Sequence, residues 1–219
     1  MKAIRLFTTA IMLVATTTMY AQFVNSGNGG NATSSNVNTD NYSRFEVSFA
    51  STTMEDVDDP FVGVSAGLLW GKSISESMPV FIEYGANLTW TARTFDYDSY
   101  YYDEEEKFNF LNVAIPINLA YKFTLPSNSD VSIVPFVGVN FKVGIIAKGK
   151  ETYDGEDETY DLYDKDEGWD ANRFQVGMNV GIGLNFNKYY IGYKFQPDFT
   201  EFAEKTKTHT NFVTLGINF

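Results

Sequence analysis

The chain has 219 residues, enough for one domain or at most two small ones. Its 28 acidic residues outnumber its 16 basic residues, for a formal net charge of -12, which argues against a nucleic acid partner because phosphate binding depends on clustered Lys and Arg. The absence of Cys excludes disulfides, Cys-ligated zinc and iron–sulfur clusters, and a single His excludes a site built from several His ligands. Aromatic residues make up 16% of the chain and Pro is scarce, a composition that favours strands over helices.

Residues 1–21 have the pattern of an export signal. Two basic residues precede an apolar stretch over 6–15, and a Thr-rich segment leads to Ala21, a small residue suited to signal peptidase cleavage. The alternative is a membrane anchor, but the apolar stretch is shorter than the roughly 20 residues that span a bilayer. We therefore predict a cleaved signal peptide over 1–21. Residues 22–41 are rich in Gly, Asn, Ser and Thr and are predicted to form a flexible N-terminal segment.

From Tyr42 onward, apolar residues recur at every second position, which is typical of a strand with two different faces. One face carries Val, Ile, Leu and aromatic residues, and the other carries Gly, Asn, Ser, Thr, Ala and a few charges. Eight such strands can close one antiparallel barrel. The predicted strands are 42–50, 61–71, 79–93, 108–123, 131–146, 173–186, 189–196 and 211–219.

The composition of the two faces decides which one points outward. A soluble barrel would line its interior with the apolar face and present a well-charged exterior to water, so an exterior of Gly and Asn would be unusual. A narrow interior of small and polar residues, with an apolar exterior in lipid, fits an outer-membrane barrel. We therefore predict an all-β fold over 42–219, an eight-stranded antiparallel transmembrane up-and-down β-barrel. In this register Ile115, Leu184 and Leu215 face lipid, whereas Asn118 and Gln175 face the interior.

The connections and the aromatic residues agree with this fold. The connections alternate between long (51–60, 94–107, 147–172 and 197–210) and short (72–78, 124–130 and 187–188), as expected for long extracellular loops and short periplasmic turns. Asn187 suits the positive φ of a two-residue hairpin. Aromatic residues gather near strand ends, as in the interfacial girdles of membrane barrels. The predicted girdle residues are Trp70, Trp90, Tyr121, Phe123, Phe186, Tyr189 and Phe219.

Three segments carry a family resemblance: LNVAIPINLAYKF (111–123), VPFVGVNFKVG (134–144) and VTLGINF (213–219). They resemble the small outer-membrane β-barrel proteins of Bacteroidota, which are often described as a porin family. The resemblance implies a Gram-negative outer membrane, a barrel fold and no catalytic set. Phe219, preceded by alternating residues, also resembles the C-terminal strand signal that outer-membrane assembly machinery reads.

Two prolines strain the pattern, since Pro cannot donate a ladder hydrogen bond. Pro116 lies in the middle of a predicted strand of a barrel without edges, where we expect a bulge or a missing bond. Pro135 lies near a predicted strand start, which accommodates it more easily.

Several charged residues fall on the inward face. An eight-stranded interior is just wide enough to be filled by side chains, and charges there must pair or stay hydrated. We therefore expect a plugged polar lumen, although a network that merely supports the fold has the same pattern. The predicted lumen network is Glu46, Glu83, Arg93, Lys122, Lys142, Arg173 and Lys194.

Two motifs that resemble catalytic or nucleotide sites fail on inspection. Residues 67–73 (GLLWGKS) have three residues between their glycines where a phosphate-binding loop needs four, and no helix pattern follows. His209, in the last predicted loop, has no nucleophile motif near it, as a Ser-His-Asp enzyme would need. We predict that the protein is not an enzyme and needs no cofactor.

The segment 151–170 holds ten acidic residues and one base. Asp164, Asp166 and Asp170 have the alternate spacing of a calcium loop but lack the distal Glu of an EF-hand. A solvated acidic loop is the plainer interpretation, and calcium binding is the alternative hypothesis.

These features favour a structural or surface-interaction protein of the outer membrane, with a plugged polar lumen and four acidic extracellular loops. The alternative is a narrow porin-like channel for ions or small solutes. The expected partners are outer-membrane lipid, lipopolysaccharide, the assembly machinery and an unidentified surface ligand.

Overall fold

The structure is a computed structural model that describes residues 39–55, 57–99, 102–125, 128–153, 156–167 and 170–219. The predicted signal peptide and most of the segment 22–41 lie outside the described residues. Among the residues that are described, no helix is long and apolar enough to cross a membrane. The elements are β1 (Tyr42–Met54), β2 (Phe61–Ser73), β3 (Val80–Ser99), β4 (Tyr102–Tyr121), β5 (Phe123–Leu125), β6 (Asn128–Tyr153), β7 (Glu156–Asp161), the 3-10 helix η1 (Lys165–Glu167), β8 (Phe174–Phe186), β9 (Tyr189–Pro197) and β10 (Thr208–Asn218).

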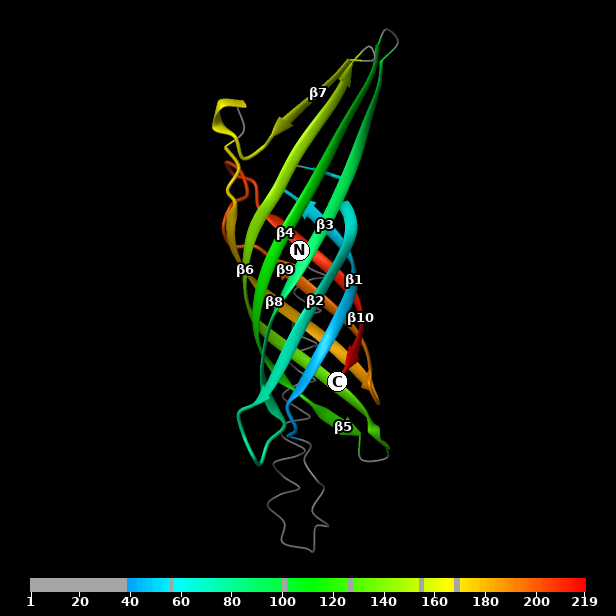
Figure 1. The fold of residues 1–219 in the computed structure, drawn as a ribbon, viewed down its shortest axis with the longest axis vertical. Coiled ribbons are helices and arrows are strands. Elements are labelled where there is room, and N and C mark those ends of the chain that lie inside the picture. The colour runs from blue at the N-terminus through cyan, green and yellow to red at the C-terminus, as the bar shows by residue number, and fades with distance from the viewer. Residues whose placement is uncertain (1–38, 56, 100–101, 126–127, 154–155, 168–169) are drawn as a thin grey trace, which may run out of the picture. The chain divides into compact units, whose positions relative to one another are not determined.

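Eight long antiparallel strands close a barrel (Figure 1). The ring runs through β1, β2, β3, β4, β6, β8, β9 and β10, and it closes where β10 pairs with β1, as in the pair of Leu215 with Val47. The short strands β5 and β7 are additions that pair with β6. The predicted eight-stranded antiparallel barrel is therefore confirmed.

The two faces of the strands point as the alternating pattern predicts. Ile115, Leu184 and Leu215 lie on the outside and are 50%, 47% and 63% exposed. Asn118 and Gln175 point inward and are each 4% exposed. An apolar exterior around a polar interior is the arrangement of a barrel that spans a membrane, where lipid solvates the outer face.

The connections separate the barrel into two ends. The long-loop end carries 51–60, 94–107, 147–172 and 197–210, and the short-turn end carries 72–78, 124–130 and 187–188. At the short-turn end, Asn187 has a φ of 54°, as predicted for the two-residue hairpin between β8 and β9.

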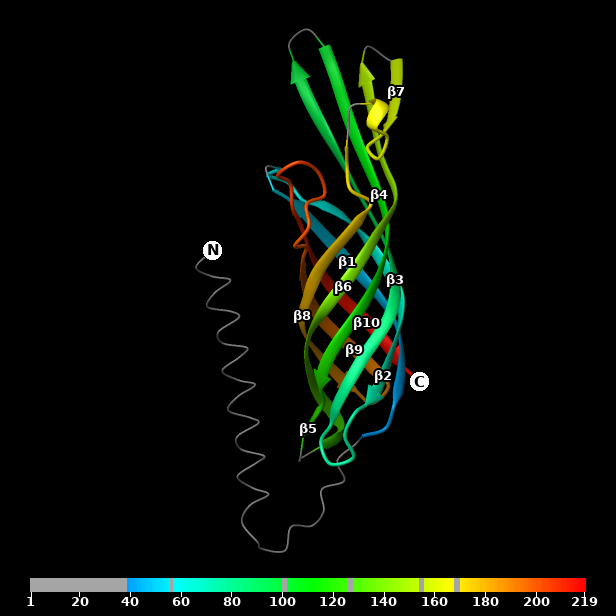
Figure 2. The same cartoon turned by 90° about the vertical axis from the view of Figure 1, so that its left-hand side faces the viewer.

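Two of the four predicted loops at the long-loop end are β-hairpins. Strands β3 and β4 stay paired up to Ser99 and Tyr102, and β6 continues to Tyr153 and pairs with β7. Both hairpins rise beyond the other connections in Figure 2. The alternation that predicts a half-buried strand fades here because acids occupy consecutive positions in the sequence, as at 103–106, whereas Tyr, Phe and Thr keep the β-propensity high.

Each of the two prolines has a paired residue in only one of its two neighbouring strands. Between β3 and β4 the pairing passes from Tyr84 with Ile117 to Asn87 with Ala114, so that Pro116 falls in the unpaired stretch. The expected missing bond is therefore present, while the register shift of β4 lies between Leu111 and Asn112.

Pro135 lies further into a strand than predicted, because β6 begins at Asn128. It pairs with Ile182 on one side, and on the other side the register places it opposite Tyr121, the last residue of β4, with which it has no ladder pair.

Candidate functional site: the barrel interior

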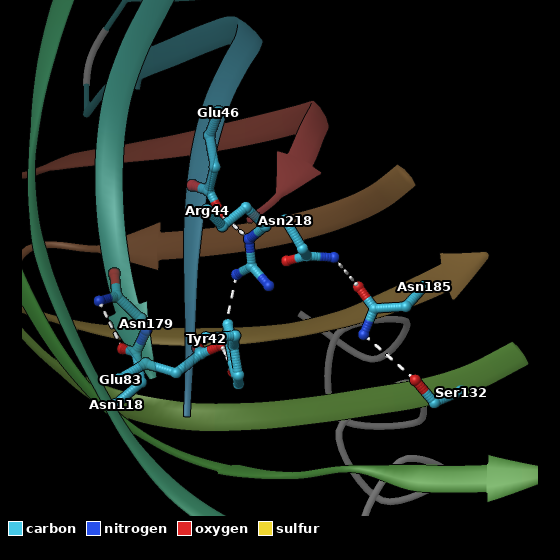
Figure 3. Close-up of polar contacts among 9 residues, drawn as sticks. All are labelled: Tyr42, Arg44, Glu46, Glu83, Asn118, Ser132, Asn179, Asn185 and Asn218. Atoms are coloured by element: carbon cyan, nitrogen blue, oxygen red, sulfur yellow. Dashed lines mark hydrogen bonds and ion pairs between the residues drawn. The ribbon is translucent and has the colours of Figure 1, made fainter. Parts of the chain in front are cut away.

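A buried ion cluster fills the interior near the short-turn end (Figure 3). Arg44 of β1 is 1% exposed; its Nε donates to Glu46 at 2.6 Å and its Nη2 donates to Glu83 of β3 at 3.3 Å. Tyr42 also donates its hydroxyl to Glu83, which has no exposed surface. Each charged side chain of the cluster therefore has a partner of opposite charge inside the barrel.

The Arg44 side chain is supported by an aromatic ring that lies flat on the barrel wall. The guanidinium carbon lies 3.7 Å from the centroid of the Tyr190 ring. Gly183 and Gly192 are paired on β8 and β9, and a Cβ on either residue would lie 2.2 Å or 2.4 Å from atoms of Tyr190. The wall glycines therefore make room for an aromatic ring inside the barrel. Gly181 accommodates Phe136 of β6 in the same way.

Amide and hydroxyl side chains link the strands around this cluster. Asn179 of β8 donates to Asn118 of β4 at 3.0 Å. Asn218 of β10 donates to Asn185 of β8 at 2.9 Å, and Asn185 donates to Ser132 of β6 at 3.2 Å (Figure 3). The Asn179–Asn118 and Asn218–Asn185 bonds join non-adjacent strands across the interior, whereas the Asn185–Ser132 bond links the neighbouring strands β8 and β6. The first two therefore fix the cross-section of the barrel as well as its wall.

A second buried ion pair lies toward the long-loop end. Lys142 of β6 is 7% exposed and donates to Asp198, a 5% exposed residue directly after β9. Thr208, the first residue of β10, also donates to Asp198. The loop between β9 and β10 is therefore fastened at its base to β6, from which β9 is separated in the ring by β8 alone.

Buried apolar side chains form a cluster toward each end of the interior, which the sequence analysis missed. At the long-loop end, Phe202 of the β9–β10 loop packs against Phe110 of β4, with ring centroids 5.7 Å apart. The buried members of this long-loop cluster are Phe61, Phe110, Ala147, Leu162, Ala171 and Phe202. At the short-turn end the buried members are Phe81, Ala120, Val134 and Phe136. A signal was present in the sequence, because apolar residues on the inward face break the alternation near the strand ends.

Little space remains between these layers. The larger cavity has a volume of about 30 Å³ and lies beneath the long-loop cluster, where Lys142 and Phe202 are among its lining residues. A smaller cavity of about 20 Å³ lies beside Arg44 and Glu83. Each holds only one or a few water molecules, since one water needs roughly 10–15 Å³ by this measure.

The predicted lumen charges do not form one network. Glu46 and Glu83 join Arg44, while Lys142 pairs separately with Asp198. The predicted network omitted Arg44, although it shares the alternating positions of Glu46. Tyr42 and Tyr190 also fall on inward positions of their strands but carry no charge, and Asp198 lies beyond the last predicted position of its strand.

The other predicted lumen charges lie near the ends of the barrel or against rings. Arg93 donates to Asp59 at 2.6 Å at the long-loop end. Lys122 follows β4 at the short-turn end, 6.0 Å from the Tyr42 ring, and Lys194 lies 4.0 Å from the Phe212 ring.

Arg173 corrects the prediction, because it is exposed and not inside the lumen. It precedes β8, so the wall no longer determines its direction, and its guanidinium lies 4.3 Å from the ring of Tyr163. Burial raises the pKa of the Tyr163 phenol to about 12, although the nearby Arg173 charge acts in the opposite direction.

The predicted girdle residues lie outward near strand ends. Trp70 and Trp90 are 40% and 46% exposed, and Phe186, Tyr189 and Phe219 are more exposed still. The rings of Tyr121 and Phe123 contact each other near the short-turn end, with centroids 4.2 Å apart and planes tilted by 39°.

The acidic segment 151–170 is held by ion pairs and hydrogen bonds. Asp170 pairs with Lys165 at 2.9 Å, and an oxygen of Asp164 accepts the backbone N–H of Asp166 at 3.0 Å. Within the described ranges, no group of three or more His, Cys, Asp or Glu residues could hold a metal ion. Calcium binding by Asp164, Asp166 and Asp170 stays a prediction. Gly168 and Trp169 lie outside the described residues.

Neither rejected motif gains support from its surroundings. Residues 67–73 form part of β2. His209 lies on β10 and not in a loop as predicted, with its ring 5.7 Å from that of Phe195. The hydroxyl-bearing neighbours Thr208 and Thr210 are buried on the other face of the strand.

The barrel's outward apolar face and buried polar interior make this an outer-membrane-type β-barrel. No family model matches the sequence, and no curated protein matches it. Solved structures with a similar fold include Ail, the attachment invasion locus protein of Yersinia pestis (15% identity, TM-score 0.38, covering 82% of this chain and 97% of that one). Others are Neisserial surface protein A (13%, TM-score 0.43, 81% and 95%) and the outer membrane enzyme PagL (13%, TM-score 0.42, 78% and 98%).

Proposed function

We propose that the protein is a closed-lumen barrel that presents a surface for interaction outside the cell. The observation that supports this proposal is the set of buried side chains that project into the interior at several levels. Two apolar clusters bound a polar interior in which Arg44, Glu83, Lys142 and Asp198 are each paired. A hydrated ion would have to displace these side chains to pass.

The interaction surface in this proposal is the pair of hairpins at the long-loop end, which would face the exterior as long loops do in outer-membrane barrels. Strands β3, β4, β6 and β7 continue one sheet beyond the other connections (Figure 2). Tyr160 of β7 crosses over Gly149 of β6 and donates to Glu106 of β4, which ties the sheet together. Its acids favour a basic partner, because complementary charge guides association.

The partners in this proposal also include outer-membrane lipid and lipopolysaccharide around the apolar belt, and assembly machinery that reads β10. A Gram-negative origin in Bacteroidota and membership of the porin-like family rest on the resemblance of three strand segments. No catalytic set is part of the proposal.

A binding screen of the full barrel in lipid nanodiscs tests the surface function, with arrays of glycans and of basic and acidic matrix proteins as probes. We expect binding to basic probes that is lost when Glu156, Asp157 and Glu158 on β7 are replaced by Gln, Asn and Gln. A matched variant with Glu201 and Glu204 replaced by Gln, in the neighbouring loop, keeps the binding. Equal binding by all three proteins, or none by the unaltered barrel, would contradict the proposal.

The second candidate function is a narrow channel. The observation that favours it is the pair of small cavities within the lumen, which would need to join and open at both ends. Ion conductance separates the two functions.

A further inference from the structure

One ring of residues lines the larger cavity at a single level of the barrel. Asn87 of β3 is paired with Ala114 of β4, Ala114 with Lys142 of β6, and Lys142 with Gln175 of β8. Gln196 of β9 lies on the remaining side. The cavity between them has a volume of about 30 Å³ and lies directly under Phe110 and Phe202.

Several polar atoms of this ring are buried and have no hydrogen-bond partner in the protein. They are Oδ1 of Asn87, Nε2 of Gln175 and Oε1 of Gln196, and Oδ1 of Asp198 is in the same condition beside Lys142. Gln175 and Gln196 are 4% and 2% exposed, so bulk water does not reach them. A buried amide without a partner is costly, because it has given up its hydrogen bonds to water, and a native interior rarely leaves several in one place.

We propose that this ring is a binding site for water or a similarly small uncharged molecule that both donates and accepts hydrogen bonds. The three acceptor atoms need donated hydrogens and the one donor needs an acceptor, and water supplies both. The volume admits about two water molecules, which excludes a sugar, an amino acid or a hydrated ion. The paired charges of Lys142 and Asp198 leave no net charge to attract an ion.

The loop between β9 and β10 closes this site from above. Asp198 fastens the base of the loop to Lys142 and Thr208, and Phe202 covers the cavity. Asn172 holds the loop from the side, since its backbone N–H donates to the carbonyl of Phe202 at 2.6 Å and its Nδ2 donates to the carbonyl of Glu201 at 3.1 Å. The bound molecules therefore exchange with bulk water only when the loop lifts.

Water-selective NMR on the full barrel in nanodiscs tests the proposal directly. We expect the side-chain amide protons of Gln175 to show cross-peaks to water that report a long-lived contact. Asn185 is the internal control, because its Nδ2 already donates to Ser132 and its Oδ1 accepts from Asn218, and we expect no such contact there. Absence of the contact at Gln175, or equal contacts at both amides, would overturn the proposal.

Two variants test separately whether the cavity holds water and whether the loop between β9 and β10 closes it. Ala114→Val fills the cavity without touching Gln175, so the water contact at Gln175 is lost while the amide spectrum of the barrel is retained. Phe202→Ala opens the cover, so the contact persists but exchanges faster with bulk water. A contact that survives Ala114→Val unchanged would place the water elsewhere and overturn the assignment of the site. Neither result depends on whether the external hairpins bind a partner.

Discussion

Replacing Arg44 by Met is the sharpest perturbation of the interior. The change removes the donor to Glu46 and Glu83 and the cation over the Tyr190 ring, while a side chain of similar length remains. Glu83 has no exposed surface, so its carboxylate is left buried without a cation. Breaking a buried ion pair on one side typically costs about 3–5 kcal/mol, and we expect a loss of unfolding free energy in that range.

The assay is reversible urea unfolding of the barrel in lipid vesicles, followed by tryptophan fluorescence. The matched control is Lys150→Met, which breaks the ion pair of Lys150 with Asp157 at 2.8 Å on the external hairpin. Those side chains are 43% and 54% exposed, so water screens the pair and we expect a far smaller loss than at Arg44. The double variant Arg44→Met/Glu83→Gln is expected to recover part of the lost unfolding free energy, because a neutral amide then replaces the buried carboxylate.

The reasoning would be refuted if Arg44→Met cost no more than Lys150→Met. It would also be refuted if the double variant were as unstable as the sum of its two single variants, because the two side chains would then not interact.

Four further outcomes are expected. Leu215→Arg lowers the unfolding free energy in vesicles by about 2–4 kcal/mol and Leu215→Ala by much less; equal costs would place water on the outer face. Gly183→Ala destabilises the barrel by about 1–3 kcal/mol through overpacking, and much less in a Tyr190→Leu background; an unchanged cost would mean that the ring and the glycine are not in contact. Burial raises the pKa of Tyr163 to about 12 from 10.0, so the unfolding free energy falls as the pH rises through this window. In a pH series of unfolding midpoints, Tyr163→Phe makes this decrease smaller. An identical series in both proteins would contradict the burial of Tyr163. Millimolar calcium slows proteolysis of the segment 151–170, less so after Asp164→Asn; no protection would leave that segment a solvated surface.

The alternation of apolar and polar residues predicts the strand number, the register and the outward face. It succeeds because lipid and the packed interior place opposite demands on successive side chains. It fails beyond about Arg93 and Ala147, because apolar and polar residues no longer alternate regularly along the hairpins. It fails again for Arg173, which precedes its strand.

The contents of the lumen are harder to predict than its wall. Inward Glu83 and Lys142 are visible in the pattern, but their partners depend on which strands face each other across the ring. Asp198 belongs to a connection whose path no periodicity defines. The wall glycines look like open space in the sequence, whereas Gly183 and Gly192 are the surface on which Tyr190 lies.

The central claim is that the lumen is closed, and single-channel recording on the mature barrel in planar lipid bilayers tests it most directly. We expect no steady conductance above the bilayer background, because apolar clusters close both ends and the Arg44 and Lys142 ion pairs cross the interior between them. Large, steady openings from the purified, folded protein would contradict the closed lumen and favour the channel.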